Sequence, residues 1–378
     1  MPSGTYAVND DAVQHQNPAD SLTRPLILAM CKNPPSAKAT GMTCSRTTEG
    51  SSLLGSPPWD KEHLRRCYFR DFRQTRHELD QFEGGVIFNE LKSLRLSLSI
   101  FVDAVDDLMT LINRFKFESS RPEFWHQTNR HSYTQIETKI QRGMLSSAMC
   151  AMALVDHSRA FVKKYPIDGY EEQVAACFQK DDRHRFIHSL RVGITHLGVT
   201  KANWEINVSK EGRTVSFLLR KDDLLRWNNW NAQAKSFILA HEKGVDVEAL
   251  FEAYSRHVEK FHNWFRISLF NKYGATLSEY LRYLRIVNSF ESQANWNLLL
   301  KQIVPQQKID PYMYLGQYLT EEQLEDVFSL PFRSKEQIDR IIALVDVYRV
   351  CTNELREDAY RVCGAKTTSR GKTSPDGP

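Results

Sequence analysis

The sequence of 378 residues contains no long apolar run. A membrane-spanning helix needs about 18 or more consecutive apolar residues, and no stretch of this chain approaches that length. Near the N-terminus, the apolar part of "RPLILAMCK" covers only Leu26 to Met30. A secretory signal needs a longer apolar segment and a small residue before its cleavage site, where this chain has the large Met30. We therefore expect a cytoplasmic protein that does not enter a membrane.

Paired cysteines are also missing. The chain has seven cysteines, and no two of them form a CxxC pair. An odd and scattered set is not typical of a disulfide framework or of a structural zinc site, and it suits reduced thiols in the cytosol. The sequence lacks a Walker loop, a nucleophile elbow and a dinucleotide-binding fingerprint as well. We therefore predict that the protein uses no cofactor.

The chain has no strong charge of one sign. Fifty Lys and Arg residues against 46 Asp and Glu residues give a formal net charge of +4 at pH 7. A dedicated DNA-binding protein usually gathers its basic residues in a dense stripe, and this sequence contains no DNA-specific motif. The charge balance neither requires nor excludes a nucleic acid partner.

The periodicity of a helix runs through most of the chain between its two ends. In "GGVIFNELKSLRLSLSIFVDAVDDLMTLINRF" the apolar residues recur at steps of three and four, which is typical of an amphipathic helix. Residues 1–57 and 364–378 are rich in small and polar residues without such a period, so we expect disordered termini. Between them we expect N-terminal helices at 58–128, a central helical bundle at 129–273 and C-terminal helices at 274–363.

The only β-structure that we expect is one hairpin at 203–219, inserted in the bundle. The segment "WEINVSKEGRTVSFLL" alternates apolar and polar residues on two arms, and its "SKEG" suits a turn. Helical periodicity then resumes, and it predicts further helices at about 247–273, 276–299, 320–328 and 334–361. The predicted fold is therefore mainly α, a helical bundle with one inserted β-hairpin.

Arg191 and His196 are the candidate catalytic residues, within the stretch "FIHSLRVGITHLGV". A histidine can take and return a proton near neutral pH, and an arginine can hold a phosphate and stabilise its negative charge. Such a pair could cleave RNA without a metal, because the histidine would help the ribose 2′-hydroxyl attack the adjacent phosphorus. In an ideal helix these two positions lie about 140° apart, so a shared cleft requires a helix end at Gly193 or Gly198, or a second subunit. The alternative is a salt-bridge or capping pair at a helix end.

Three stretches of the chain carry a resemblance to a known family. They are "ALVDHSRAFV" (153–162), "DRHRFIHSLRVGITHLGV" (182–199) and "DLLRWNNWNAQAKSFILAHEKGVDVEALFEAYSRHVEKFHNWF" (223–265). Together with the hairpin they resemble an uncharacterised bacterial group related to the HEPN superfamily, over about residues 129–273. Catalytic HEPN proteins cleave RNA without a metal, by an Arg-x4–6-His motif that typically lies in a cleft between two subunits.

The resemblance implies a homodimer that acts on RNA, with Arg191 and His196 in the two motif positions and a role in bacterial stress or phage defence. The sequence departs from the pattern at Val192, where active members usually have a polar residue. Valine can neither donate nor accept a hydrogen bond from its side chain. Two hypotheses therefore stay open: a metal-independent endoribonuclease, and a non-catalytic helical interaction or scaffold module.

Two further groups of polar residues have competing interpretations. His184 and His188 are four residues apart, with Asp181 nearby, and such a set could bind zinc. No third-ligand motif completes it, so we expect a solvated polar face and no metal. Asp156 and His157 could orient a phosphate or a partner, but we expect a position on the helix surface or a hydrogen bond between helices.

Overall fold

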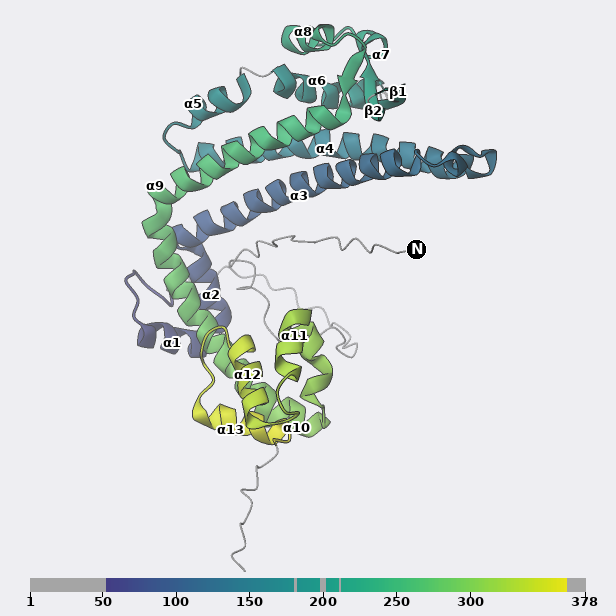
Figure 1. Ribbon diagram of the computed structural model, residues 1–378. Coiled ribbons are helices and arrows are strands. Elements are labelled where there is room, and N and C mark those ends of the chain that lie inside the picture. Colours follow the sequence, from purple (N-terminus) through teal and green to yellow (C-terminus); the bar gives the residue numbers. More distant parts are fainter. Residues whose placement is uncertain (1–51, 180–181, 198–201, 211, 366–378) are drawn as a thin grey trace, which may run out of the picture. The chain divides into compact units, whose positions relative to one another are not determined.

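The computed structural model describes residues 52–179, 182–197, 202–210 and 212–365 (Figure 1). The described chain is mainly α-helical with a small antiparallel sheet, so the predicted fold class is confirmed. The chain divides into a first unit, residues 1–79 with 282–378, and a second unit, Asp80–Leu281. Most of the two termini for which we predicted disorder, residues 1–51 and 366–378, lies outside the described residues. Among the described helices, none is both long enough and apolar enough to span a bilayer.

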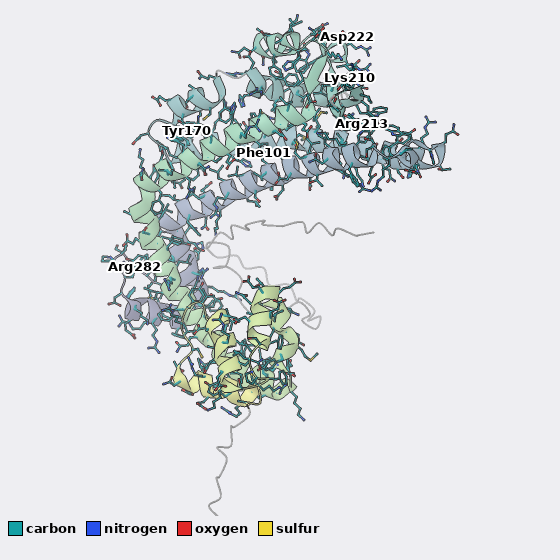
Figure 2. All side chains as sticks on the ribbon, viewed as in Figure 1. Phe101, Tyr170, Lys210, Arg213, Asp222 and Arg282 are labelled. Atoms are coloured by element: carbon teal, nitrogen blue, oxygen red, sulfur yellow. The ribbon has the colours of Figure 1, made fainter. Side chains whose placement is uncertain are left out.

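Two long helices pack against each other in the second unit. These are α3 (Glu83–Glu118) and α4 (Arg130–Lys164), joined by two short 3-10 helices at Pro122–Trp125 and Gln127–Asn129. The apolar stripe predicted for α3 faces the core, and Phe101, labelled in Figure 2, is fully buried against Tyr254. Because α3 shares this core with the bundle, the division expected at residue 128 does not coincide with the boundary between the units.

The long helix α9 contributes to both units. It spans Val247–Leu298 without interruption, whereas the sequence predicted two helices that meet near Gly274. A glycine inside a helix costs only about 1 kcal/mol relative to alanine, which the packing on either side of Gly274 easily offsets. A π-helical turn, Leu299–Ile303, follows α9. The prediction of a boundary at residue 273 was therefore wrong for the helix.

The predicted hairpin is confirmed within the second unit. Strands β1 (Ala202–Ser209) and β2 (Gly212–Arg220) are antiparallel, with Trp204 opposite Phe217. A third strand, β3 (Gly244–Asp246), pairs with β2, so the prediction that the hairpin is the only β-structure was wrong. Three residues are too few to produce a recognisable alternation.

Short elements precede α6 and follow β2 in the chain. The segment before α6 (Asp182–Leu197) consists of α5 (Tyr170–Val174) and a π-helical turn, Ala175–Gln179. After β2 come α7 (Lys221–Leu225) and α8 (Ala232–Ala240). Arg213 of β2, labelled in Figure 2, donates a hydrogen bond of 2.9 Å to the carbonyl of Ser119, which ties the hairpin to the end of α3.

The first unit consists of shorter helices around the end of α9. Its N-terminal helices are α1 (Lys61–Arg70) and α2 (Phe72–Gln81). Its C-terminal elements are α10 (Val304–Gln307), a 3-10 helix (Pro311–Gln317), α11 (Glu321–Phe328), α12 (Lys335–Val345) and α13 (Asn353–Val362). The sequence predicted one helix over 334–361, but the structure divides it. Asp346 accepts hydrogen bonds from the amides of Val350 and Cys351 and so stabilises the turn.

Residues 52–57 belong to the folded part of this unit, although the sequence assigned them to a disordered segment. Leu54 is only 2% exposed, and its amide donates a hydrogen bond of 2.8 Å to the carboxylate of Glu78. The amide of Leu53 donates to the other oxygen of the same carboxylate at 2.9 Å. Burial raises the pKa of Glu78, but these bonds and those from Gln74 and Ser52 outweigh it and lower the pKa to about 2. Two isolated leucines give no periodic signal, so sequence patterning could not reveal this anchor.

Candidate functional site

Arg191 lies on α6 where that helix packs against α4. Its guanidinium faces the carboxylate of Asp156 on α4, with 3.9 Å between Nη1 and Oδ2. Arg159, one turn further along α4, approaches the other oxygen of Asp156 at 4.0 Å. The Asp156 side chain is 63% exposed, and ion pairs of this kind contribute only about 0–1 kcal/mol. The pairing of Arg191 with Asp156 is therefore weak.

His188 lies one turn before Arg191, and its pKa is lowered by its surroundings. Burial lowers the pKa of His188, and the neighbouring charges of Arg191, Arg159 and Arg185 lower it further, whereas Asp156 raises it. Three guanidinium groups near one carboxylate leave a local excess of positive charge. This surface of α4 and α6, which we call the arginine face, is suited to an anion such as a phosphate.

The backbone of α6 continues through both candidate catalytic positions to Leu197. The helix therefore does not end at Gly193, which was one of the two helix ends considered from the sequence. Gly193 instead permits close packing, because a Cβ atom there would lie 3.1 Å from the ring of Trp227. The His196 side chain is outside the described part of the structure, so its distance from Arg191 stays untested. On a continuous helix, positions 191 and 196 point about 140° apart.

The structure describes both residues of the "DH" pair on α4, Asp156 and His157. Asp156 contacts Arg191 of α6, as described above. His157 makes a hydrogen bond of 2.6 Å between its Nδ1 and the hydroxyl of Ser97 on α3. The interhelical hydrogen bond is therefore confirmed for His157, whereas Asp156 lies on the helix surface and forms exposed ion pairs.

His184 and His188 do not share the solvated face that the sequence predicted. His184 stacks on the ring of Tyr254, with an interplanar angle of 13°, and its Nδ1 lies 3.1 Å from the tyrosine hydroxyl. His188 is exposed on the arginine face. Asp181 lies outside the described residues. Within the described ranges, no group of three His, Cys, Asp or Glu side chains is placed so that it could hold a metal ion.

A second partly buried histidine was not singled out by the sequence. His262 on α9 lines a cavity of about 40 Å³, together with His184, Arg159, Phe178 and Tyr254. Burial lowers the pKa of His262 to about 4, so its ring is neutral at physiological pH. Nothing in the apolar periodicity of this helix distinguishes a buried histidine from an exposed one, so only the structure identifies this group.

The stability of the second unit should therefore depend on pH through His262. Its folded pKa of about 4 lies below the ordinary value of 6.5, so the unfolded chain binds more protons between these pH values. The stabilising contribution is complete above pH 6.5 and should fall by up to about 3 kcal/mol as the pH falls towards 4. The measurement is the free energy of unfolding against pH for the wild type and His262→Phe, which should have a smaller slope. His126→Phe, at an exposed histidine of the same unit, is the control. An unchanged slope in His262→Phe would contradict the assignment.

Comparisons with known proteins found no relative of this chain. The family models contain no match to this chain, and neither the curated proteins nor the solved structures include a similar one. The relationship to the HEPN superfamily is therefore a prediction from the three sequence stretches.

Proposed function

We propose that the protein is a HEPN-like, metal-independent endoribonuclease, with its site on the arginine face around Arg191. The observation that supports this most is the environment of His188, where burial and then the charges of Arg191, Arg159 and Arg185 lower the pKa, and Asp156 raises it. The three guanidinium groups that contribute to this shift would also attract an incoming anion. A role in bacterial stress or phage defence follows from the family resemblance.

In this proposal Arg191 exchanges its carboxylate partner for a phosphate of the RNA. The ion pair with Asp156 is long and solvent-exposed, whereas a bidentate bond between guanidinium and phosphate is shorter and stronger. His196 takes the proton of the ribose 2′-hydroxyl as that oxygen attacks the phosphorus, and it returns a proton to the leaving oxygen. Arg191 stabilises the charge that develops on the phosphate. No step requires a metal or a cofactor.

The purified chain should cleave mixed RNA in the presence of EDTA. Arg191→Ala and His196→Ala should each reduce the cleavage rate at least about tenfold, because each removes a group that acts in the transition state. Arg226→Ala is the matched control, since the Arg226 side chain is 81% exposed in the same unit and forms its ion pair with Asp223, three residues earlier in the chain. Cleavage that stops on chelation, or that survives both substitutions, would contradict the proposal.

The proposed site is composite, so we also expect a homodimer through the arginine face. On the continuous α6 helix, Arg191 and His196 point in different directions, and a two-fold axis could bring each arginine near the other subunit's histidine. Sedimentation at micromolar concentration should report a dimer. Arg191→Glu should dissociate it, because the reversed charge would face Asp156 and its own copy across the interface. A monomeric wild type, or a dimer that tolerates this change, would remove the composite site.

One observation favours a second function, a non-catalytic interaction or scaffold module. Val192 occupies the position where active members of the family usually have a polar residue, and it cannot orient a phosphate. A protein of this kind would form the same dimer and would not cleave RNA. The cleavage assay and the sedimentation measurement together therefore distinguish the two functions.

A further inference from the structure

The first unit contains a cavity of about 330 Å³ that is separate from the arginine face of the second unit. Its walls come from the end of α9, the π-helical turn, the 3-10 helix at Pro311–Gln317, α12 and α13. Most of the lining is apolar, and it includes Leu299, Leu300, Val304, Leu315, Ile338 and Ile342. This volume falls within the roughly 300–1,000 Å³ of sites that hold small molecules.

One wall of the cavity is polar. Asn288, Glu291, Ser292 and Asn295 line it from α9, at the three- and four-residue spacing that places side chains on one helix face. Asn288 accepts a hydrogen bond of 2.5 Å from Arg76, which also lies 3.7 Å from Glu291. The positive and negative charges at this end therefore offset each other.

Ser292 and Asn295 differ from their neighbours on this wall. Both are partly buried, and neither side chain forms a hydrogen bond with any other residue in the described part of the chain. Asn288, in contrast, is satisfied by Arg76 and by the Tyr348 hydroxyl, to which it donates at 3.0 Å. A partly buried amide and hydroxyl that face an apolar cavity offer hydrogen bonds to a molecule inside it.

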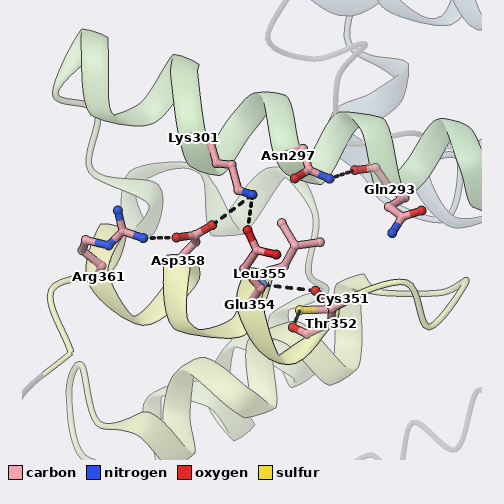
Figure 3. A network of polar contacts seen from close by, with 9 residues as sticks. All are labelled: Gln293, Asn297, Lys301, Cys351, Thr352, Glu354, Leu355, Asp358 and Arg361. Carbon is pink, nitrogen blue, oxygen red and sulfur yellow. Dashed lines mark hydrogen bonds and ion pairs between the residues drawn. The ribbon is translucent and has the colours of Figure 1, made fainter.

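The far wall is held in place by a polar network (Figure 3). Lys301 of the π-helical turn pairs with Glu354 of α13 at 2.6 Å and lies 3.8 Å from Asp358. These contacts connect the π-helical turn to α13. Ala359 of α13 and Cys363, which follows this helix, line the cavity. The π-helical turn itself supplies Leu299 and Leu300, and such turns are frequent at functional sites. The cavity is thus bounded by constrained elements and not by a loose surface.

We propose that this cavity binds a neutral, largely apolar small molecule that carries one hydrogen-bonding group. Protein interiors contain few voids larger than a water molecule, because the residues that line an empty void lose dispersion contacts. Water would find few polar partners in this mostly apolar lining. A charged ligand would be desolvated against apolar walls, while Arg76 and Glu291 already neutralise each other. The polar group of the ligand contacts Ser292 and Asn295, and its apolar part lies against α12 and the π-helical turn.

The test uses N-phenylnaphthylamine, a neutral aromatic dye with a single N–H group that fluoresces in apolar surroundings. The full chain should bind it saturably and one-to-one. Ser292→Trp fills the cavity without breaking a bond within the described chain, and it should abolish binding. Asn295→Leu keeps the volume and removes the acceptor, so it should weaken binding about fivefold.

Asn297→Leu is the matched control, because Asn297 is on the same helix, bonds to the carbonyl of Gln293 and does not line the cavity. It should bind the dye as the wild type does. The proposal is overturned if the wild type does not bind saturably, or if Ser292→Trp and Asn295→Leu both bind normally. Tighter binding of the anionic dye anilinonaphthalene sulfonate would overturn the requirement for a neutral ligand. Circular dichroism melting of each variant separates loss of binding from loss of folding.

Discussion

Gln337→Leu should destabilise the first unit by about 4 kcal/mol, because four protein groups would lose a hydrogen-bond partner. Gln337 is fully buried on α12. Its amide nitrogen donates to the carbonyls of Val327 at 2.9 Å and Leu330 at 3.4 Å. Its oxygen accepts from the amide of Arg333 and the hydroxyl of Tyr312, both at 2.8 Å. Leucine has nearly the same volume, so the loss would report the hydrogen bonds and not a cavity.

The bond to Arg333 explains why this glutamine matters for the turn between α11 and α12. Arg333 has a φ of 59°, in the left-handed region that non-glycine residues seldom adopt. Gln337 holds that conformation by accepting from the Arg333 amide. Without this bond the turn would lose its orientation, and α11 would separate from α12.

Urea unfolding and hydrogen exchange of peptides from residues 311–345 would measure the effect. Gln323→Leu is the matched control, since Gln323 caps α11 at an exposed position and its loss should cost about 1 kcal/mol or less. Equal losses for the two variants would show that the buried network does not stabilise the unit as we infer.

Gly244→Ala should destabilise the second unit by about 4 kcal/mol, from backbone strain and a steric clash together. Gly244 begins β3 with a φ of +151°, a conformation that residues with a side chain rarely adopt. A Cβ atom there would lie 2.3 Å from the carbonyl oxygen of Leu219 on β2. Both atoms belong to or adjoin the backbone, so no rotamer change could relieve the contact.

Gly212→Ala provides the control for strain alone. Gly212 has a φ of +129° at the start of β2, and a Cβ atom there would have nothing within 4 Å. Its substitution should cost about 1–2 kcal/mol, the strain without the clash. Urea unfolding of both variants would measure the difference. If Gly244→Ala is no more destabilising than Gly212→Ala, the close approach of β3 to β2 does not contribute to stability.

Sequence patterning predicted the elements whose side chains report burial periodically. The stripe on α3 is buried where it was expected, at Ile87, Leu94, Phe101, Val105, Leu108 and Ile112. The alternating arms of the hairpin pair with Trp204 opposite Phe217. Both patterns arise because a long element repeats its exposure every turn or every second residue, so many residues carry the same signal.

Elements without repetition were not predictable. Strand β3 has three residues, and its place depends on the edge that β2 offers. The anchor at Leu53 and Leu54 depends on Glu78, about 25 residues away. The continuity of α9 past Gly274 depends on packing that outweighs the glycine cost. In each case the deciding partner is distant in the chain, so no local pattern encodes it.

For the candidate site, too, the sequence determined some features and the tertiary structure determined others. The sequence by itself determined that Arg191 and His196 are five positions apart, with chemistry suited to cleaving RNA, and the structure placed both positions on α6. Only the tertiary structure decided that Asp156 of α4 pairs with both Arg191 and Arg159. It also decided that His184 stacks on Tyr254 while His188 stays on the arginine face. The spacing along a helix is fixed by its covalent geometry, but the charges around a side chain come from the helices packed against it.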